Sequence, residues 1–341
     1  MIRQSTKKAR WRSWRSMNPE LRRTAARRGV RLGWSVFRAL LLIGLAYILL
    51  YPILYMVTMS VRDKNDMFDI TVNWIPKHFT LYTLQRIWKA MEYPATLLNT
   101  IFLSGICSLL SAAVCSLAAY GFARFRFKGQ GVMFALVVFS IIVPPSFYNM
   151  PAYIGYRNFS VFGLLDLWNL FTGGNVSINL IGTHWPMILP ALFGVGLRAG
   201  LFIYLFRQFF KGMPKELEEA AYIDGCGYMQ TFLRIMVPSA FSVFVTVFLF
   251  AFVWYWNDYQ VASLMMGSSN MTLSTGLSII DTLTYSLDAA NSTTGTQIVD
   301  TVRTALDRQG ACLLVIGPLI LLYVVLQRYF VESIERTGLV E

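Results

Sequence analysis

The sequence predicts an all-α integral membrane protein with six transmembrane helices. Of its 341 residues, 55% are hydrophobic and only 14% are charged, whereas a soluble domain carries about 25% charged residues. Six apolar segments are near the length of about 20 residues that a helix needs to cross the hydrocarbon layer. Lysine and arginine gather in alternate loops, which is typical of membrane topology. Because lipid removes the need for a polar surface, these observations favour one membrane unit over two soluble domains.

The six predicted spans follow one another with polar loops between them. The first has no charged residue, is longer than a signal-peptide core, and lacks a small-residue cleavage site at Tyr55–Thr58, so we expect it to stay as an anchor. Pro144 and Pro145 should break the third span. The predicted spans are Ala39–Ser60, Thr96–Tyr120, Val132–Met150, Pro186–Phe206, Val237–Asn257 and Ala311–Leu326.

The distribution of basic residues predicts that both termini are cytoplasmic. In that orientation, the inside segments hold 21 Lys and Arg residues and the outside segments hold 8. The predicted organisation is a basic cytoplasmic tail at residues 1–38, a six-helix domain at residues 39–330, and a cytoplasmic tail at residues 331–341. Within the domain, residues 207–237 form a cytoplasmic loop. Residues 262–310 form an external lobe because they are too long and polar for a plain connector.

Charge and composition exclude several functions. The net charge is +12, but twelve of the 30 basic residues lie in the first 38 positions, which indicates topology and not nucleic-acid binding. This tail, with Trp11 and Trp14, either lies on anionic membrane lipid or is disordered, and both interpretations stay open. Four cysteines without metal-ligand spacing and two histidines predict neither a metal site nor a disulfide. The chain also lacks a phosphate-binding G-x-x-x-x-G-K-[ST] motif, so we expect no cofactor bound by this chain.

The loop at residues 207–237 contains the most informative stretch, Pro214–Gly225. Pro214 suits the first turn of a helix, acidic residues follow at the positive end of the helix dipole, and Gly225 can adopt the left-handed conformation that ends a helix. The pattern predicts about three helical turns, followed by a second short helix at Tyr228–Met236. This segment could be an ordinary surface helix. However, the small side chains of Ala220 and Ala221 would let the backbone of another protein approach closely.

The segment Glu219-Ala220-Ala221-x-x-Asp224-Gly225 resembles the EAA loop of ABC importer permeases. The longer stretch Glu216–Gly225 is similar to the carbohydrate-uptake branch, whose members include maltose-permease MalG-like subunits. The resemblance covers about residues 35–335. It is supported by the stretches Ile75-Pro76, Gly121–Arg124, Leu205–Phe210, Trp256–Tyr259 and Leu326–Phe330.

The resemblance implies an importer-type permease fold with a cytoplasmic coupling helix in a bacterial cytoplasmic (inner) membrane. The helix would dock on a separate ATPase dimer, which would hold ATP and Mg. Glu219 would pair with a basic residue there, Ala220 and Ala221 would allow close approach, and Gly225 would form the turn; Leu217 and Asp224 complete this predicted coupling set. A second, homologous permease subunit and an extracellular or periplasmic solute-binding protein are the other implied partners.

Two groups of residues are candidates for a translocation path. Arg198 is the one charge deep in a predicted span, where charges are costly and usually functional. It either contacts solute or pairs with an acid on the second permease subunit, or it lies at a helix break and extends toward the membrane surface or binds backbone carbonyls. The second group could stack on sugar rings and bind hydroxyls, or form an interfacial aromatic belt. It comprises Trp254, Tyr255, Trp256, Asn257 and Asp258.

The predicted function is therefore a transmembrane permease subunit, not an enzyme. It would form half of the path for an oligosaccharide or a sugar-derived solute. The alternatives are a receptor or assembly subunit without transport activity, and a membrane-embedded lipid-modifying enzyme. The enzyme would need clustered acids or histidines at the membrane face. This sequence instead places its acids mostly in Pro214–Gly225 and in outer loops.

Overall fold

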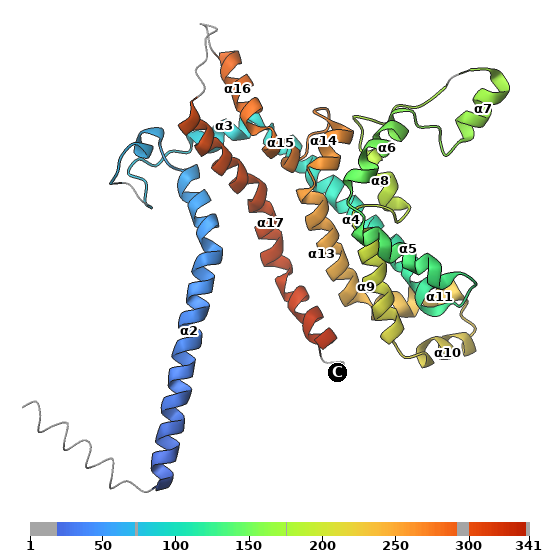
Figure 1. The fold of residues 1–341 in the computed structure, drawn as a ribbon, viewed down its shortest axis with the longest axis horizontal. Coiled ribbons are helices and arrows are strands. Elements are labelled where there is room, and N and C mark those ends of the chain that lie inside the picture. Colours follow the sequence, from blue (N-terminus) through green and yellow to red (C-terminus); the bar gives the residue numbers. More distant parts are fainter. Residues whose placement is uncertain (1–18, 72–73, 175, 292–299, 339–341) are drawn as a thin grey trace, which may run out of the picture. The chain divides into compact units, whose positions relative to one another are not determined.

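The structure is a computed structural model that describes residues 19–71, 74–174, 176–291 and 300–338. Every regular element in these ranges is a helix, and the β contacts recorded there are two isolated bridges, Arg62 with Phe79 and Phe159 with Ile178. The chain divides into two compact units, Met1–Thr58 and Met59–Glu341, and each is described by itself (Figure 1).

The first unit consists, in its described part, of helix α2, Pro19–Ser60, which ends just beyond the unit boundary. Its section Arg31–Ser60 is long and apolar enough to cross a membrane. The helix begins twenty residues before the predicted span Ala39–Ser60, so the end of the predicted basic tail is helical. Residues 1–18 of that tail, with Trp11 and Trp14, lie outside the described residues.

The second unit contains two more helices that meet the length and hydropathy of a span: α4 and the section Thr301–Val325 of α17. Two further pairs of helices meet these criteria only when the two helices of a pair are counted as one span. Each pair is sharply bent, by 100° in one and by 79° in the other. The described residues therefore supply three candidate spans, or up to five, where the sequence predicts six. The two straight candidates of the second unit are α4, Tyr93–Arg124, and the section of α17, Thr301–Gly338. The first bent pair is α5, Gln130–Ile142, with α6, Ser146–Arg157. The second joins the segment from α11, Tyr228–Thr231, to α12, Val237–Ser239, with α13, Phe241–Asn257.

The third predicted span breaks where the sequence indicates. α5 ends at Ile142 and α6 begins at Ser146, with Pro144 and Pro145 between them. Proline lacks a backbone N–H and disfavours helical geometry in the preceding residue, so two in succession end α5. The chain then turns by 100°, and Val132–Met150 is not one straight helix.

The fourth predicted span, Pro186–Phe206, is wrong as a single helix. It is divided into α8, Trp185–Leu192, and α9, Ala199–Gly212. The physical reason lies in the break: Gly194 has φ 69° and Arg198 has φ 56°, and neither left-handed conformation can continue a right-handed helix.

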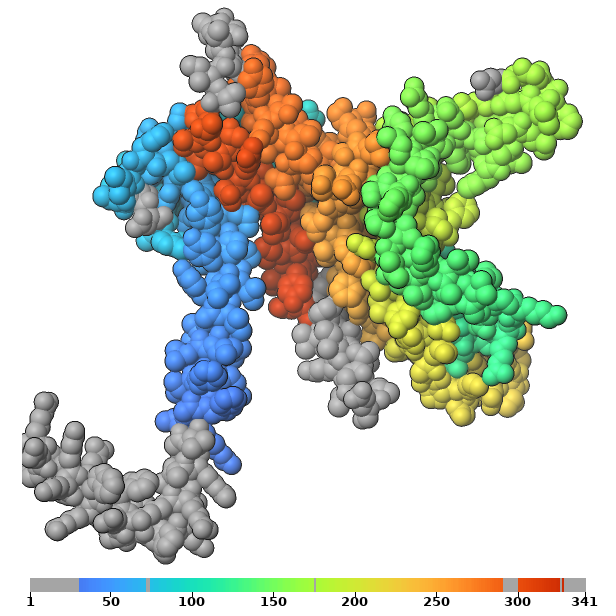
Figure 2. Space-filling view, viewed as in Figure 1, coloured from blue at the N-terminus to red at the C-terminus, as the bar shows by residue number. Residues whose placement is uncertain are grey.

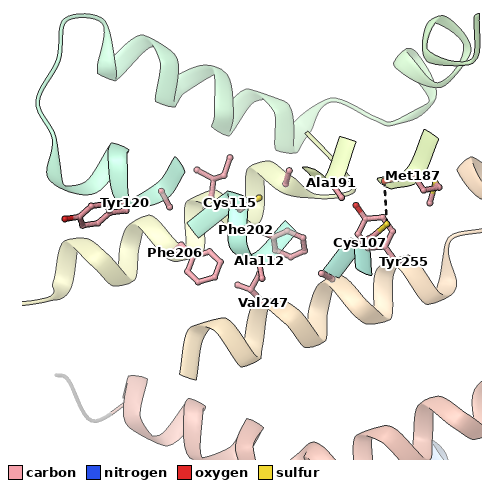
Figure 3. Packing of buried hydrophobic residues seen from close by; sticks show 14 of the residues in the cluster. Cys107, Ala112, Cys115, Tyr120, Met187, Ala191, Phe202, Phe206, Val247 and Tyr255 are labelled. Atoms are coloured by element: carbon pink, nitrogen blue, oxygen red, sulfur yellow. Dashed lines mark hydrogen bonds between the residues drawn. The ribbon is translucent and has the colours of Figure 1, made fainter. Parts of the chain in front are cut away.

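The main core of the second unit lies where α4, α8, α9 and α13 pack together (Figure 3). α4 presents small buried side chains, Cys107, Ala112 and Cys115, to the bulky Phe202 and Phe206 of α9. Small residues at such contacts let apolar helices approach closely. The Cys107 thiol faces the Met187 carbonyl oxygen at 3.6 Å, and all four cysteines are free in the structure.

The outer predicted loops form a second, smaller core with the start of α17. Ile87 of α3, Tyr82–Ala90, and Leu273 pack against Ala311 of α17. α17 begins ten residues before the predicted span Ala311–Leu326. The outer predicted loops also contain the 3₁₀ helix Lys64–Met67, α15 Leu273–Ser278 and α16 Ile280–Asn291, together with α14 Gln260–Met266, whose buried residues belong to the main core.

Charged contacts join these outer elements. Arg86 of α3 donates to Asp307 of α17 over 3.0 Å and to Asp288 of α16 over 2.6 Å. In the segment before α3, His78 contacts Asp66 through its ring Nδ1 at 2.7 Å and its backbone N–H at 2.8 Å. The hydrogen bonds from His78 lower the pKa of Asp66, and the same carboxylate raises the pKa of His78.

The segment around α7, Leu164–Thr172, is exposed along most of its length (Figure 2). Its apolar side chains, including Leu170 and Phe171, pack into neither core.

Candidate functional site

The predicted coupling helix is α10, Glu216–Ile223. It has eight residues, about two turns instead of the predicted three, because Pro214 and Lys215 lie outside it. Gly225 has φ 82°, the predicted left-handed conformation. The Gly225 N–H donates to the Tyr222 carbonyl over 3.1 Å, and the Cys226 N–H donates to the Ala221 carbonyl over 2.9 Å. These bonds satisfy carbonyl groups at the end of the helix.

α10 is fixed to the end of α4 by a buried ion pair. The Arg124 guanidinium lies 3.4 Å from the Glu218 carboxylate, and the side chains are only 6% and 9% exposed. Arg124 also donates to the Met213 carbonyl over 2.9 Å. The sequence pattern did not reveal this pair, since Glu218 stands among other acids of a predicted exposed first turn. The signal that could have found it is a charged residue at the end of each of two neighbouring helices.

The structure divides the predicted coupling residues into two groups. Glu219, Ala220, Asp224, Gly225 and Leu217 are exposed. Ala221 is only 2% exposed, so its methyl group packs within its own chain and is not available to another protein, unlike the prediction. Sequence reasoning missed Ile223, which is 85% exposed and adds an apolar side chain beside the acidic ones.

A cavity of about 360 Å³ lies at the two helix breaks, lined by the α5–α6 turn and by Gly194–Leu201. A second cavity of about 350 Å³ shares Tyr148 and Val195–Leu197 with the first and reaches Tyr255. Gly200 allows α9 to approach α5 here: an added Cβ would lie 2.5 Å from the Ser140 hydroxyl and 2.8 Å from the Val137 carbonyl oxygen.

Arg198 lines the first cavity from the N-terminal end of α9. Its guanidinium carbon lies 5.6 Å from the centre of a Trp254 ring, which is within the range of a cation–π contact. The structure therefore brings together Arg198 and Trp254, which the sequence analysis treats as separate candidates.

The other members of the aromatic group have different surroundings. The Tyr255 hydroxyl is buried, accepts a hydrogen bond from the Leu197 N–H over 3.2 Å, and so ties α13 to the α8–α9 break. Trp256 is buried in the second, smaller core, where its indole N–H donates to the Val315 carbonyl over 3.2 Å. Asn257 is exposed and donates to the carbonyl of Val253 over 2.9 Å.

The Asp258 carboxylate caps α14. It accepts the backbone N–H of Ala262 over 3.0 Å and that of Val261 over 3.5 Å. Of the five predicted residues, Tyr255 thus lines the second cavity and Trp254 contacts Arg198 of the first, while Trp256, Asn257 and Asp258 have structural contacts. Within the described ranges, no three His, Cys, Asp or Glu residues are grouped so that they could hold a metal ion.

Comparison with known proteins gives a consistent family. The model of the binding-protein-dependent transport system inner membrane component family matches residues 23–336. A probable ABC transporter permease protein of Bacillus subtilis, YurM, is 27% identical over 304 residues, covering 88% of this chain and 85% of its own length. The arabinooligosaccharides transport system permease protein AraQ of Halalkalibacterium halodurans is 26% identical and covers 86% of this chain and 92% of its own.

A solved structure has the same fold. It is a bacterial ABC transporter involved in the import of the acidic polysaccharide alginate, and it matches with a TM-score of 0.66 at 20% identity, covering 89% of this chain and 98% of the matched chain. With the family match over nearly the whole length, this chain belongs to the binding-protein-dependent transport system inner membrane component family and is a multi-pass ABC transporter permease subunit of the inner membrane, with no catalytic role of its own.

Proposed function

We propose that this chain forms half of the translocation path for a carbohydrate solute. The names of its relatives support this proposal: one transports arabinooligosaccharides, and another, MelC of Bacillus subtilis, imports melibiose, raffinose and stachyose at 24% identity. We place both termini in the cytoplasm on the basis of the Lys and Arg distribution. We also propose that α8 and α9 together complete a sixth span.

The observation that carries the coupling role is the two-sided arrangement of α10. Glu218 and Ala221 face the chain's own interior, whereas Glu219, Ala220 and Ile223 are open. An exposed acid next to an exposed apolar side chain is suited to a partner surface with a basic residue at the edge of an apolar cleft. The proposed partner is the ATPase dimer, which binds ATP and Mg.

Coupling would then proceed through contacts that the chain already contains. Movement of the ATPase would displace α10, and the Arg124–Glu218 pair would pass the displacement to α4. α4 packs against α9 and α13. Arg198, at the start of α9, lines the cavity and contacts Trp254 of α13. A second permease subunit would supply the other wall of the path, and an external solute-binding protein would deliver the solute.

Affinity purification of the full-length chain from its native membranes in mild detergent tests this function. The wild type should bring down an ATPase and a second permease. Glu219→Arg should lose the ATPase and keep the second permease, because the reversed charge repels a basic partner residue. Asp166→Arg, a matched reversal on the exposed helix α7, should keep both. Purification of the wild type without any ATPase would contradict the proposal, as would equal ATPase recovery with all three chains.

A further inference from the structure

Arg198 places a permanent positive charge in a cavity within the predicted fourth span. Arg198 lines a cavity of about 360 Å³ whose other walls include Leu136, Val137 and Ile141. Arg198 is exposed in the chain taken alone, so its charge is open to an anionic ligand or to an acidic group of a partner subunit. In the part of the chain that the structure describes, no ion pair with Arg198 is recorded, and its recorded neighbour is the face of Trp254.

The backbone at this position adds a second, separate observation. Arg198 has φ 56° and ψ 21°, a left-handed conformation that is strained for a residue with a Cβ. Glycine is the usual residue for such a position, and this segment uses glycine at 194, 196 and 200. An arginine makes the backbone at this break less stable than a glycine would. Its presence therefore indicates that the guanidinium side chain has a function at this position.

The nearest acid in sequence to Trp254 does not neutralise this charge. Asp258 lies at the end of α13, and its carboxylate oxygens accept the N–H groups of Val261 and Ala262. That carboxylate is committed to the cap of α14. The cavity thus offers one cation, the ring of Trp254 behind it, and the hydroxyl-bearing side chains Ser140 and Tyr148.

We infer that Arg198 is a binding residue for the carboxylate of an anionic sugar, and that the solute is an oligosaccharide containing uronic acid. This inference rests on the proposed function, because it names the solute class of the proposed path. A guanidinium can bind a carboxylate through two parallel hydrogen bonds. The two cavities share Tyr148, Gly196 and Leu197, so sugar rings next to the bound carboxylate have adjoining space.

Equilibrium binding to the purified importer complex tests this inference. The probes are radiolabelled trigalacturonate and α-1,4-linked galactotriose, which have the same length and linkage and differ in their carboxylates. The complexes carry wild-type chain, Arg198→Gln, Arg198→Lys or Arg157→Gln. Arg157 is an exposed arginine at the end of α6 that does not line the cavity, so its substitution removes one charge elsewhere.

The wild type and Arg157→Gln should bind trigalacturonate at least about tenfold more tightly than galactotriose, as a charge-assisted bond of typical strength implies. Arg198→Gln should bind both equally, and Arg198→Lys should keep part of the preference because the charge remains. The inference is overturned if the wild type binds both sugars equally or binds neither. It is also overturned if Arg198→Gln keeps the full preference for trigalacturonate. Loss of the second permease from the Arg198→Gln complex, without any sugar preference in the wild type, would assign the guanidinium to a carboxylate of that subunit. Recovery of the ATPase is scored in the same preparations, so failure of the permease function is seen separately from failure of sugar selectivity.

Discussion

Replacement of Arg124 by alanine should detach α10 from the permease. The substitution leaves the Glu218 side chain, which is 9% exposed in the wild type, without its counter-ion, and it removes the bond to the Met213 carbonyl. At 3.4 Å and an effective dielectric constant of about 20, the attraction between the two charges is roughly 5 kcal/mol. Mutations that break one side of a buried pair typically cost about 3–5 kcal/mol. The raw attraction omits desolvation, so the expected loss is the mutational figure of about 3–5 kcal/mol, a large fraction of the stability of a small domain.

The assay is ATPase recovery with the purified chain, together with the melting temperature of the complex. Arg124→Ala should lower both. Arg126→Ala is the matched control, since Arg126 is exposed and lies two residues further along the chain. The double variant Arg124→Met with Glu218→Met should recover most of the melting temperature, because a pair of apolar residues leaves no buried charge. A double-mutant cycle then isolates the energy of the pair itself.

The reasoning would be refuted if Arg124→Ala matched the Arg126→Ala control in both measurements. It would also fail if the double variant were less stable than either single variant. That result would mean that the two charged side chains stabilise the fold through separate contacts.

Three further predictions concern glycines and the outer loop. Gly225→Ala should destabilise the complex by about 1 kcal/mol, since φ is +82° and no atom lies within 4 Å of an added Cβ; a thermal melt measures it. Gly200→Ala should cost about 1–3 kcal/mol by overpacking, because the new methyl group would overlap Ser140; unfolding in graded SDS measures it. The His78–Asp66 contact should protect backbone amides of the outer loop, as read by hydrogen-exchange protection factors. The pKa of His78 is raised from 6.5, so its contribution is complete below pH 6.5 and is lost as the pH rises through the raised pKa. The pKa of Asp66 is lowered from 3.8, so its contribution is present above pH 3.8 and is lost as the pH falls through the lowered pKa.

Controls separate these effects from general instability. Gly227→Ala also meets no atom within 4 Å and has negative φ, so it should be milder than Gly225→Ala. If the two cost the same, the argument from backbone conformation is wrong. Gly200→Ala without any change in stability would show that α5 and α9 move apart freely. Unchanged protection in His78→Gln across the whole pH range would exclude the proposed contact.

Sequence reasoning predicted helix identity well and helix continuity poorly. The apolar run of the first span, the break at Pro144 and Pro145, and the left-handed Gly225 are all local features that a few neighbouring residues determine. The break between α8 and α9 entered the sequence analysis only as an alternative at Arg198, because its signal is spread over several glycines and one arginine. Amino-acid propensities favour a negative φ for arginine, so they do not predict the positive φ of Arg198.

The candidate site shows the same division. The exposure of Glu219 and the turn at Gly225 follow from the sequence motif. The partners of Glu218, Tyr255 and Trp256 do not, because each contacts a residue at least 58 positions away along the chain. Such contacts depend on how the helices pack, which hydrophobic pattern alone does not specify.

The unbroken course of α17 across the outer boundary of its predicted span has a mechanical consequence. Asp307, held by Arg86, and Val315, whose carbonyl accepts the Trp256 indole, lie on one continuous helix. Eight residues of α-helix span only about 12 Å, and no loop intervenes to absorb a displacement. A tilt imposed at the outer surface must therefore appear at α13 with nearly its full amplitude. In the proposed topology, a protein that docks on the predicted external lobe would therefore move α17 and α13 together.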